Sequence, residues 1–173
     1  MTNVRILEAK SEHAVDACEV LIRSIKEICA PDYNNDEKIL SEWLENKTPK
    51  NIREWIESPS NYSVVASTDE GNIVGFALIT NNEVMLNYIL PEYLYKGIGK
   101  LMLISLETYA LEQGHTTISA KSSITAKEFY VRNGFISSGE PEYVGDILGD
   151  FPMIKTLTHN QSLQRTRDKT ARH

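Results

Sequence analysis

The sequence has 173 residues, a formal net charge of −6 and 41% apolar residues. This length suits one domain with its own core, and the ordinary composition excludes a wholly disordered chain. Surfaces that bind nucleic acid are basic, so the charge argues against a nucleic-acid partner. It fits a cationic partner better, although most soluble proteins use such charge only for solubility.

The cysteines and the apolar segments indicate the compartment. Cys18 and Cys29 belong to no metal-ligand spacing, so we expect free thiols and no metal site. No apolar run has the length of a membrane span, and the opening MTNVRILEAK has no hydrophobic signal region. These features predict a cytoplasmic protein with no membrane partner.

The first third of the chain is predicted to contain one strand and then helices. A β-rich run predicts a strand over residues 4–7, and apolar residues at three- and four-residue spacing predict a helix over 11–29. Ala30-Pro31-Asp32 should break that helix, because proline disfavours helix at the residue before it. Further helices are expected over residues 36–43 and 51–56.

The middle of the chain reads as an antiparallel meander. Strands are predicted over residues 62–67, 73–80 and 83–90. The turn signals between them are Asp69-Glu70-Gly71-Asn72 and Asn81-Asn82, which are typical hairpin connections.

The last third returns to alternating elements. A helix over residues 97–113 should bury Ile98, Met102, Leu106 and Tyr109 and end at Gly114. A strand over 116–120, a helix over 123–132 and strands over 135–138 and 153–157 follow. The order predicts one α+β domain over residues 1–157, with a mostly antiparallel mixed sheet flanked by helices. Residues 158–173 form a polar tail that we expect to be flexible, the alternative being a partner-binding tail.

The segment between the third meander strand and the next helix is the most informative. It reads Pro91-Glu92-Tyr93-Leu94-Tyr95-Lys96-Gly97-Ile98-Gly99-Lys100. Its glycines let the backbone turn and approach a ligand, and the helix that follows offers free N–H groups and a positive dipole end. Together these features favour a phosphate or pyrophosphate site, to which Lys96 and Lys100 would add charge. Taken alone, the glycine spacing also fits a plain strand-to-helix turn.

Two familiar nucleotide motifs do not fit this segment. A Walker A loop would need Ser or Thr where Leu101 stands and glycine where Leu94 stands. A dinucleotide fingerprint would need a third glycine where Met102 stands.

The segment resembles the cofactor loop of GNAT acetyltransferases, Q/R-x-x-G-x-G/A, whose backbone amides bind the CoA pyrophosphate. Gly97 and Gly99 match this pattern, while Leu94 replaces the usual Gln or Arg. Residues 122–135 resemble a second GNAT pattern, N-x-x-A-x-x-F-Y-x-x-x-G-F. There Ser123 replaces Asn, and the matching residues are Ala126, Phe129, Tyr130, Gly134 and Phe135. The resemblance covers roughly residues 4–157.

The resemblance implies acetyl-CoA as co-substrate and an open cleft that holds it. The strand over residues 84–90 would be splayed from the strand over 116–120, and a backbone amide near Ile89 would polarise the thioester carbonyl. The residues expected to contact the cofactor are Ile89, Leu90, Leu94, Tyr95, Lys96, Gly97, Ile98, Gly99, Lys100, Ser123 and Tyr130.

Two residues are predicted to carry catalysis. In the family the tyrosine at the position of Tyr130 often protonates the departing thiolate, whereas periodicity alone also allows Tyr130 a purely core role. Glu83 is the candidate general base, directly or through a water, because some lysine-modifying members look similar there. The alternative is an exposed glutamate at a strand end.

The acceptor site is expected under the early helices. Acidic and aromatic groups gather there in sequence and suit a cationic amine, although the tryptophans also fit as core anchors. These residues are Asp32, Tyr33, Asp36, Trp43 and Trp55. We therefore predict an N-acetyltransferase for a small-molecule amine such as a polyamine or amino acid. A protein lysine or N-terminal acetyltransferase and a non-catalytic acyl-CoA-binding module are the alternatives, and the resemblance also allows a homodimer.

Overall fold

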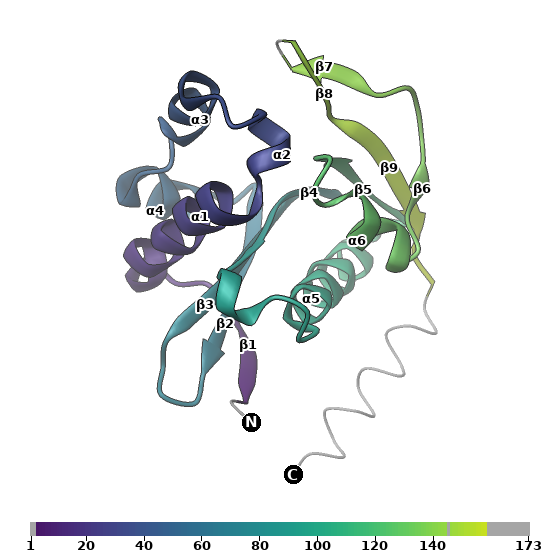
Figure 1. Cartoon of the computed structure of the whole chain (residues 1–173). Helices are drawn as coiled ribbons and strands as arrows, with labels where there is room; N and C mark the ends of the chain where they lie inside the picture. Colours follow the sequence, from purple (N-terminus) through teal and green to yellow (C-terminus); the bar gives the residue numbers. More distant parts are fainter. Residues whose placement is uncertain (1–2, 145, 159–173) are drawn as a thin grey trace.

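A computed structural model of the protein describes residues 3–144 and 146–158. Its main feature is a seven-stranded sheet in the order β1-β2-β3-β4-β5-β9-β6. Figure 1 shows α1 and α4 on one side of this sheet and α5 and α6 on the other. The predicted α+β fold is confirmed, while the predicted tail lies outside the described residues from position 159 onward.

The strands run antiparallel to their neighbours except for β4 and β5, which are parallel. The strands of the main sheet are β1 (Val4–Glu8), β2 (Asn61–Thr68), β3 (Ile73–Thr80), β4 (Glu83–Ile89), β5 (Thr117–Ser122), β6 (Ile136–Ser137) and β9 (Phe151–Thr156). A separate hairpin pairs β7 (Glu142–Val144) with β8 (Ile147–Gly149). The helices are η1 (Ser11–His13), α1 (Ala14–Ile28), α2 (Ala30–Tyr33), α3 (Glu37–Leu44), α4 (Pro49–Glu57), η2 (Pro91–Tyr93), α5 (Ile98–Glu112) and α6 (Lys127–Arg132).

The helix predicted over 11–29 ends at Ile28, so the predicted break before Pro31 is confirmed. Two local features differ from the prediction, besides the short helix α2, which follows at once because Pro31 lies in its first turn, where the missing N–H is not needed. The helix predicted over 123–132 begins only at Lys127, since the Ser123 hydroxyl accepts the Ala126 N–H at 3.2 Å and holds a turn there. The β7–β8 hairpin was missed because its strands are only three residues long.

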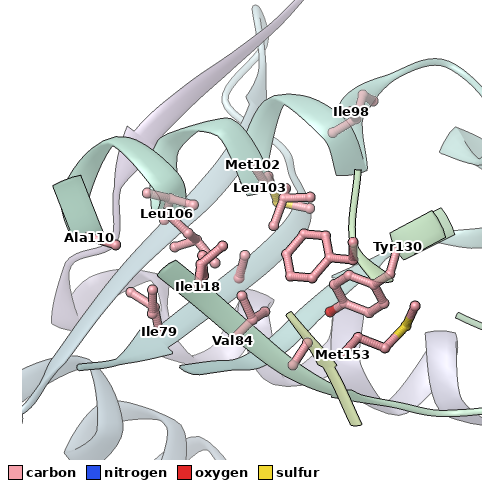
Figure 2. Close-up of a cluster of buried hydrophobic side chains, with 14 of the residues drawn as sticks. Ile79, Val84, Ile98, Met102, Leu103, Leu106, Ala110, Ile118, Tyr130 and Met153 are labelled. Atoms are coloured by element: carbon pink, nitrogen blue, oxygen red, sulfur yellow. The ribbon is translucent and has the colours of Figure 1, made fainter. Parts of the chain in front are cut away.

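The sheet is buried on both faces, and each face has its own core. Beneath α1, Leu21 packs with Val65 and Phe76. Beneath α5, Met102 and Leu106 pack with residues of the opposite face of β2 and β3, and Figure 2 shows part of this second core. Of the predicted helix stripe, Ile98, Met102 and Leu106 are buried, whereas Tyr109 is partly exposed and stacks on Tyr62 at 4.4 Å.

The pairing of β4 with β5 is short. Only Glu83 with Ser119 and Val84 with Ala120 are in register. The register between β3 and β4 shifts just beyond this point, leaving Met85 as an extra residue in β4. Such a bulge bends and twists its strand, which accounts for the separation of β4 from β5 after Val84. We call the space between the diverging strands the split.

A buried ion pair joins α5 to β9. Lys155 Nζ lies 2.7 Å from Glu107 Oε1, and the two side chains are 15% and 1% exposed. Both charged groups are largely removed from solvent, so each depends on the other to offset the cost of its burial.

Replacing Lys155 by Met should therefore lower the free energy of unfolding by about 3–5 kcal/mol, because it leaves the Glu107 carboxylate buried without its cation. Urea unfolding would measure the change. Arg132→Met is the matched control, since it breaks the exposed Glu128–Arg132 pair and should have little effect. Equal losses in the two variants would contradict the assignment.

Candidate active site

The loop from β4 to α5 leaves the helix N-terminus open. Gly97 precedes α5 with φ +80°, a left-handed conformation that favours glycine, and no side chain caps the helix. The first bond within the helix runs from the Leu101 N–H to the Gly97 carbonyl at 3.1 Å. The preceding N–H groups, including those of Ile98, Gly99 and Lys100, therefore have no partner inside the helix and can bind an anion.

The side chains of this loop divide into exposed and packed groups. Tyr95 is 95% exposed at φ +60°, and Lys96 and Lys100 are also exposed. Ile98 is buried in the core beneath α5, so its side chain serves packing and only its backbone N–H is available to a ligand. Leu94 is partly buried.

Gly97 and Gly99 are required in the loop for different structural reasons. A Cβ on Gly97 would meet no atom within 4 Å, so Gly97 is needed for its backbone angle. A Cβ on Gly99 would lie 3.3 Å from Phe129, so Gly99 lets α5 approach α6 closely. The Asn87 side chain also donates to the Gly99 carbonyl at 3.3 Å and ties β4 to the first turn of α5.

An ion pair fixes the start of the loop. Arg23 of α1 pairs with Glu92 in η2 and also with Glu27 at 3.0 Å. The hydrogen bonds from Arg23 lower the pKa of Glu92. Glu92 is therefore charged and paired with Arg23, and this pair joins η2 to α1 before the chain reaches α5.

The backbone of β4 faces the split. The Leu90 N–H donates to the Val74 carbonyl of β3 at 2.9 Å. Because an antiparallel ladder alternates, the N–H groups of Asn87 and Ile89 point away from β3 and toward the split. The Ile89 side chain packs against the core beneath α5, so only its backbone is directed toward the split.

Tyr130 lies in the core beneath α5, in the same cluster as Val84 and Ala120, the last pair before β4 and β5 separate. Its side chain is 6% exposed and packs edge-on against Phe129 and Phe135, with ring centroids 5.3 and 5.1 Å away. Figure 2 shows its ring within the same cluster as Val84 and Met153. Burial raises the pKa of Tyr130 well above that of an ordinary phenol, so the hydroxyl keeps its proton at physiological pH. Tyr130 can therefore pack in the core and still carry a proton to donate, so the two roles predicted for it do not exclude each other.

The opposite face of the sheet carries Tyr88, which sequence reasoning missed. Tyr88 packs with the core beneath α1, the face opposite Val84. Burial raises its pKa strongly, and Cys29, Tyr130 and Asp32 add smaller upward contributions. The two-residue spacing of Leu86 and Tyr88 in a predicted strand indicates that both side chains lie on the same face of the sheet, and this was the signal available in the sequence.

The remaining predicted residues are not all at the split. Glu83 begins β4, beside the last pairs with β5 and about 20 Å along the strand from Ile89. Since Val84 faces α5, alternation turns Glu83 toward the side of α1, the side of Tyr88. The Ser123 hydroxyl is engaged by the Ala126 N–H and not free.

The predicted acceptor residues also separate into two groups. Tyr33 donates to the Lys26 carbonyl at 2.9 Å and contacts Trp43 edge-on, while Asp36 caps α3. Trp55 packs against the core beneath α1. These four residues build the helical layer. Asp32 instead reaches across to the turn before α6, where its Oδ1 accepts the Thr125 N–H at 2.9 Å.

Other features of the described residues bear on the earlier predictions. Cys18 and Cys29 are free thiols, as predicted, and both are buried. Over residues 3–144 and 146–158, no helix has the length and apolarity needed to cross a bilayer. Within the same ranges no three His, Cys, Asp or Glu side chains gather as metal ligands. A cavity of about 300 Å³ lies between α1 and α3, lined by Lys26, Glu37 and Leu40 among others, and is separate from Tyr130 and the split.

Comparisons with known proteins agree with this architecture. The model of an acetyltransferase (GNAT) domain matches residues 29–157. The chain therefore belongs to the GNAT acetyltransferase family, as the two motifs indicated.

Individual relatives are more distant. The peptidyl-lysine N-acetyltransferase YjaB of Salmonella typhimurium is 32% identical over 93 residues, which are 54% of this chain and 62% of that protein. The match thus spans less than two thirds of the length of that relative.

Two solved structures show the shared fold. A GCN5-related N-acetyltransferase from Rhodopseudomonas palustris gives a TM-score of 0.79 at 22% identity, covering 91% of this chain and 98% of that one. The PaiA N-acetyltransferase from Thermoplasma acidophilum, solved in complex with coenzyme A, gives 0.73 at 23% identity, covering 89% and 99%.

The backbone angle at Gly97 gives a test of the anion site. Gly97→Ala should weaken CoA binding about tenfold, because alanine in the left-handed region costs about 1–2 kcal/mol and the loop must relax. Gly71→Ala is the control, since Gly71 has φ +88° and equally open surroundings but lies in the β2–β3 turn. Calorimetry should find similar stability losses in both variants and weakened CoA binding only in Gly97→Ala. Unchanged CoA binding in Gly97→Ala would remove this loop from the cofactor site.

Proposed function

We propose that this protein transfers the acetyl group of acetyl-CoA to the amine of a small molecule. The observation that carries the proposal is the separation of β4 from β5 after Val84, with an uncapped α5 N-terminus after β4 and Tyr130 packed in the same cluster as Val84. Membership of the GNAT family supports the same reaction.

The residues present suit the proposed co-substrate. The first-turn N–H groups of α5, with Lys96 and Lys100 nearby, would hold the pyrophosphate. Leu94 and Tyr95, which belong to the same loop, would contact the cofactor beside the pyrophosphate. Leu90 and Ser123 would contact it where it enters between β4 and β5. Acetyl-CoA, when bound, supplies a thioester whose acyl carbon is open to attack by an amine.

The chain would act on this thioester at two points. The Ile89 N–H would donate to the carbonyl oxygen as negative charge develops on it. Glu83, the base expected from the sequence, begins β4 about 20 Å along the strand from Ile89, so the attacking nitrogen would give its proton to water instead. As the carbon–nitrogen bond forms and the carbon–sulfur bond breaks, Tyr130 would give its proton to the sulfur.

A small acceptor is favoured over a polypeptide by what covers the split. The hydrogen bond from the Thr125 N–H to Asp32 joins α2 to the turn before α6. Strand β8 of the β7–β8 hairpin also contacts α2, and Figure 1 shows the hairpin beyond the end of the main sheet. For an acceptor that enters between α2 and the turn before α6, these contacts would leave less room for a polypeptide than for a small amine. The name of the YjaB relative keeps a protein acceptor as the second candidate.

Calorimetric titration with acetyl-CoA, using CoA and NADH as controls, would test the co-substrate. We expect acetyl-CoA and CoA to bind and NADH not to bind. Thiol release with a panel of small amines and lysine peptides would then identify the acceptor. Absence of binding at millimolar acetyl-CoA would overturn the proposal, and transfer to peptides alone would favour the second candidate.

Tyr130→Phe should lower kcat about 10²- to 10⁴-fold, because it removes the proton donor and keeps the aromatic packing. The dissociation constant for CoA should stay within about twofold, since the phenol contributes to the leaving step rather than to binding. Tyr109→Phe is the control, because Tyr109 stacks on Tyr62 away from the split. Full turnover in Tyr130→Phe would leave Tyr130 with a packing role only.

A further inference from the structure

A side-chain hydrogen bond joins β4 to the first turn of α5. Asn87 Nδ2 donates to the Gly99 carbonyl at 3.3 Å, and both residues are partly buried. Asn87 stands two residues before Ile89, whose side chain packs in the core beneath α5, so the two side chains share that face of the sheet. A helical carbonyl uses one lone pair for the N–H four residues later and keeps a second one for another donor. The bond from Asn87 therefore links strand to helix without disturbing the pairing of either element.

The same residue of α5 also lies against α6. A Cβ on Gly99 would be 3.3 Å from the Phe129 ring, so the start of α5 approaches this ring as closely as a glycine permits. Phe129 in turn packs edge-on against Tyr130, with ring centroids 5.3 Å apart. Gly99 is thus the point at which the first turn of α5 is located against both β4 and the helix that carries Tyr130.

Under the proposed function, these three elements hold different parts of one molecule. The first-turn N–H groups of α5 would bind the pyrophosphate, the Ile89 N–H would face the thioester carbonyl, and Tyr130 would face the sulfur. CoA would therefore occupy two subsites that its pantetheine arm connects. A ligand of this kind gains affinity from its second subsite only when the spacing between the subsites matches the length of the connection.

We propose that Asn87 is a positioning residue, whose bond to Gly99 sets the spacing between the pyrophosphate subsite on α5 and the thioester subsite on β4. The inference rests on the proposed function and adds to it the element that aligns its two subsites. Without this bond, the first turn of α5 can shift relative to β4. The thioester is then held out of line with the Ile89 N–H and with Tyr130, and a misplacement of about 1 Å can cost about 10²-fold in rate.

Binding of CoA and of a shorter ligand tests the spacing. The shorter ligand is adenosine 3′-phosphate 5′-diphosphate, which is CoA without its pantetheine arm. Asn87→Leu removes the donor and keeps a side chain of similar size. Calorimetry should find CoA bound about tenfold more weakly by Asn87→Leu, and the shorter ligand bound within about twofold of the wild type. Equal weakening of both ligands, or unchanged binding of CoA, would overturn the proposal.

Turnover at saturating acetyl-CoA gives the second measurement. In Asn87→Leu, kcat should fall about 10- to 100-fold, because the co-substrate is bound but its thioester is misaligned. A purely structural role would lower the midpoint in urea and leave the turnover of the folded protein unchanged. An Asn87→Leu protein with the kcat of the wild type would therefore contradict the positioning role.

Control variants separate this role from general damage. Asn51→Leu is the matched control, since it removes a bond of the same kind, from Asn51 Nδ2 to the Asn46 carbonyl at 2.9 Å, at the start of α4. It should leave the binding of both ligands and kcat unchanged. Asn87→Ser, whose side chain is too short to reach Gly99, is the second variant and should reproduce the pattern if Asn87→Leu does not fold.

The wild-type titrations distinguish failure of this inference from failure of the proposed function. If the wild type binds neither CoA nor the shorter ligand, the proposed co-substrate is wrong and the positioning role is lost with it. If the wild type binds acetyl-CoA and transfers its acetyl group, while both Asn87 variants do so equally well, the positioning role is wrong and the acetyltransferase assignment stands.

Discussion

The rest of the site depends on one constraint, which is that β4 leaves β5 immediately after the Val84–Ala120 pair. The bulge at Met85 turns β4 away, and the backbone of Asn87 and Ile89 then faces the split instead of a neighbouring strand. Backbone N–H and C=O groups inside a protein need partners. The split therefore calls for an extended ligand with amide groups of its own, and the amide-containing arm of CoA matches that need.

The split also connects two faces that a continuous sheet would keep apart. Tyr130 belongs to the core beneath α5, and Tyr88 belongs to the core beneath α1. Tyr88 and Tyr130 thus belong to opposite faces of the sheet near the point where β4 separates from β5, and backbone donors of β4 lie between them.

Local features were predictable from the sequence, whereas relations between distant segments were not. Glycines and turn residues marked the meander and the loop at Gly97, and spacing in the second motif marked Tyr130. The bulge at Met85 is a property of two strands in register, so no single strand reveals it. The bond between Thr125 and Asp32 joins residues 93 positions apart, and only the folded chain brings them together. The sequence assigned both loop glycines to the ligand, but the contact with Phe129 gives Gly99 a packing role.

Two acidic side chains tie together segments that are far apart in the sequence. Glu107 is buried beneath α5, where Lys155 neutralises it and the pair links helix to sheet. Asp32 accepts the Thr125 N–H at 2.9 Å, and this bond joins α2 to the turn before α6. Because a buried charge depends on its partner, the first link would be lost with either member of the pair, and both links hold the layers on which the separation of β4 from β5 depends.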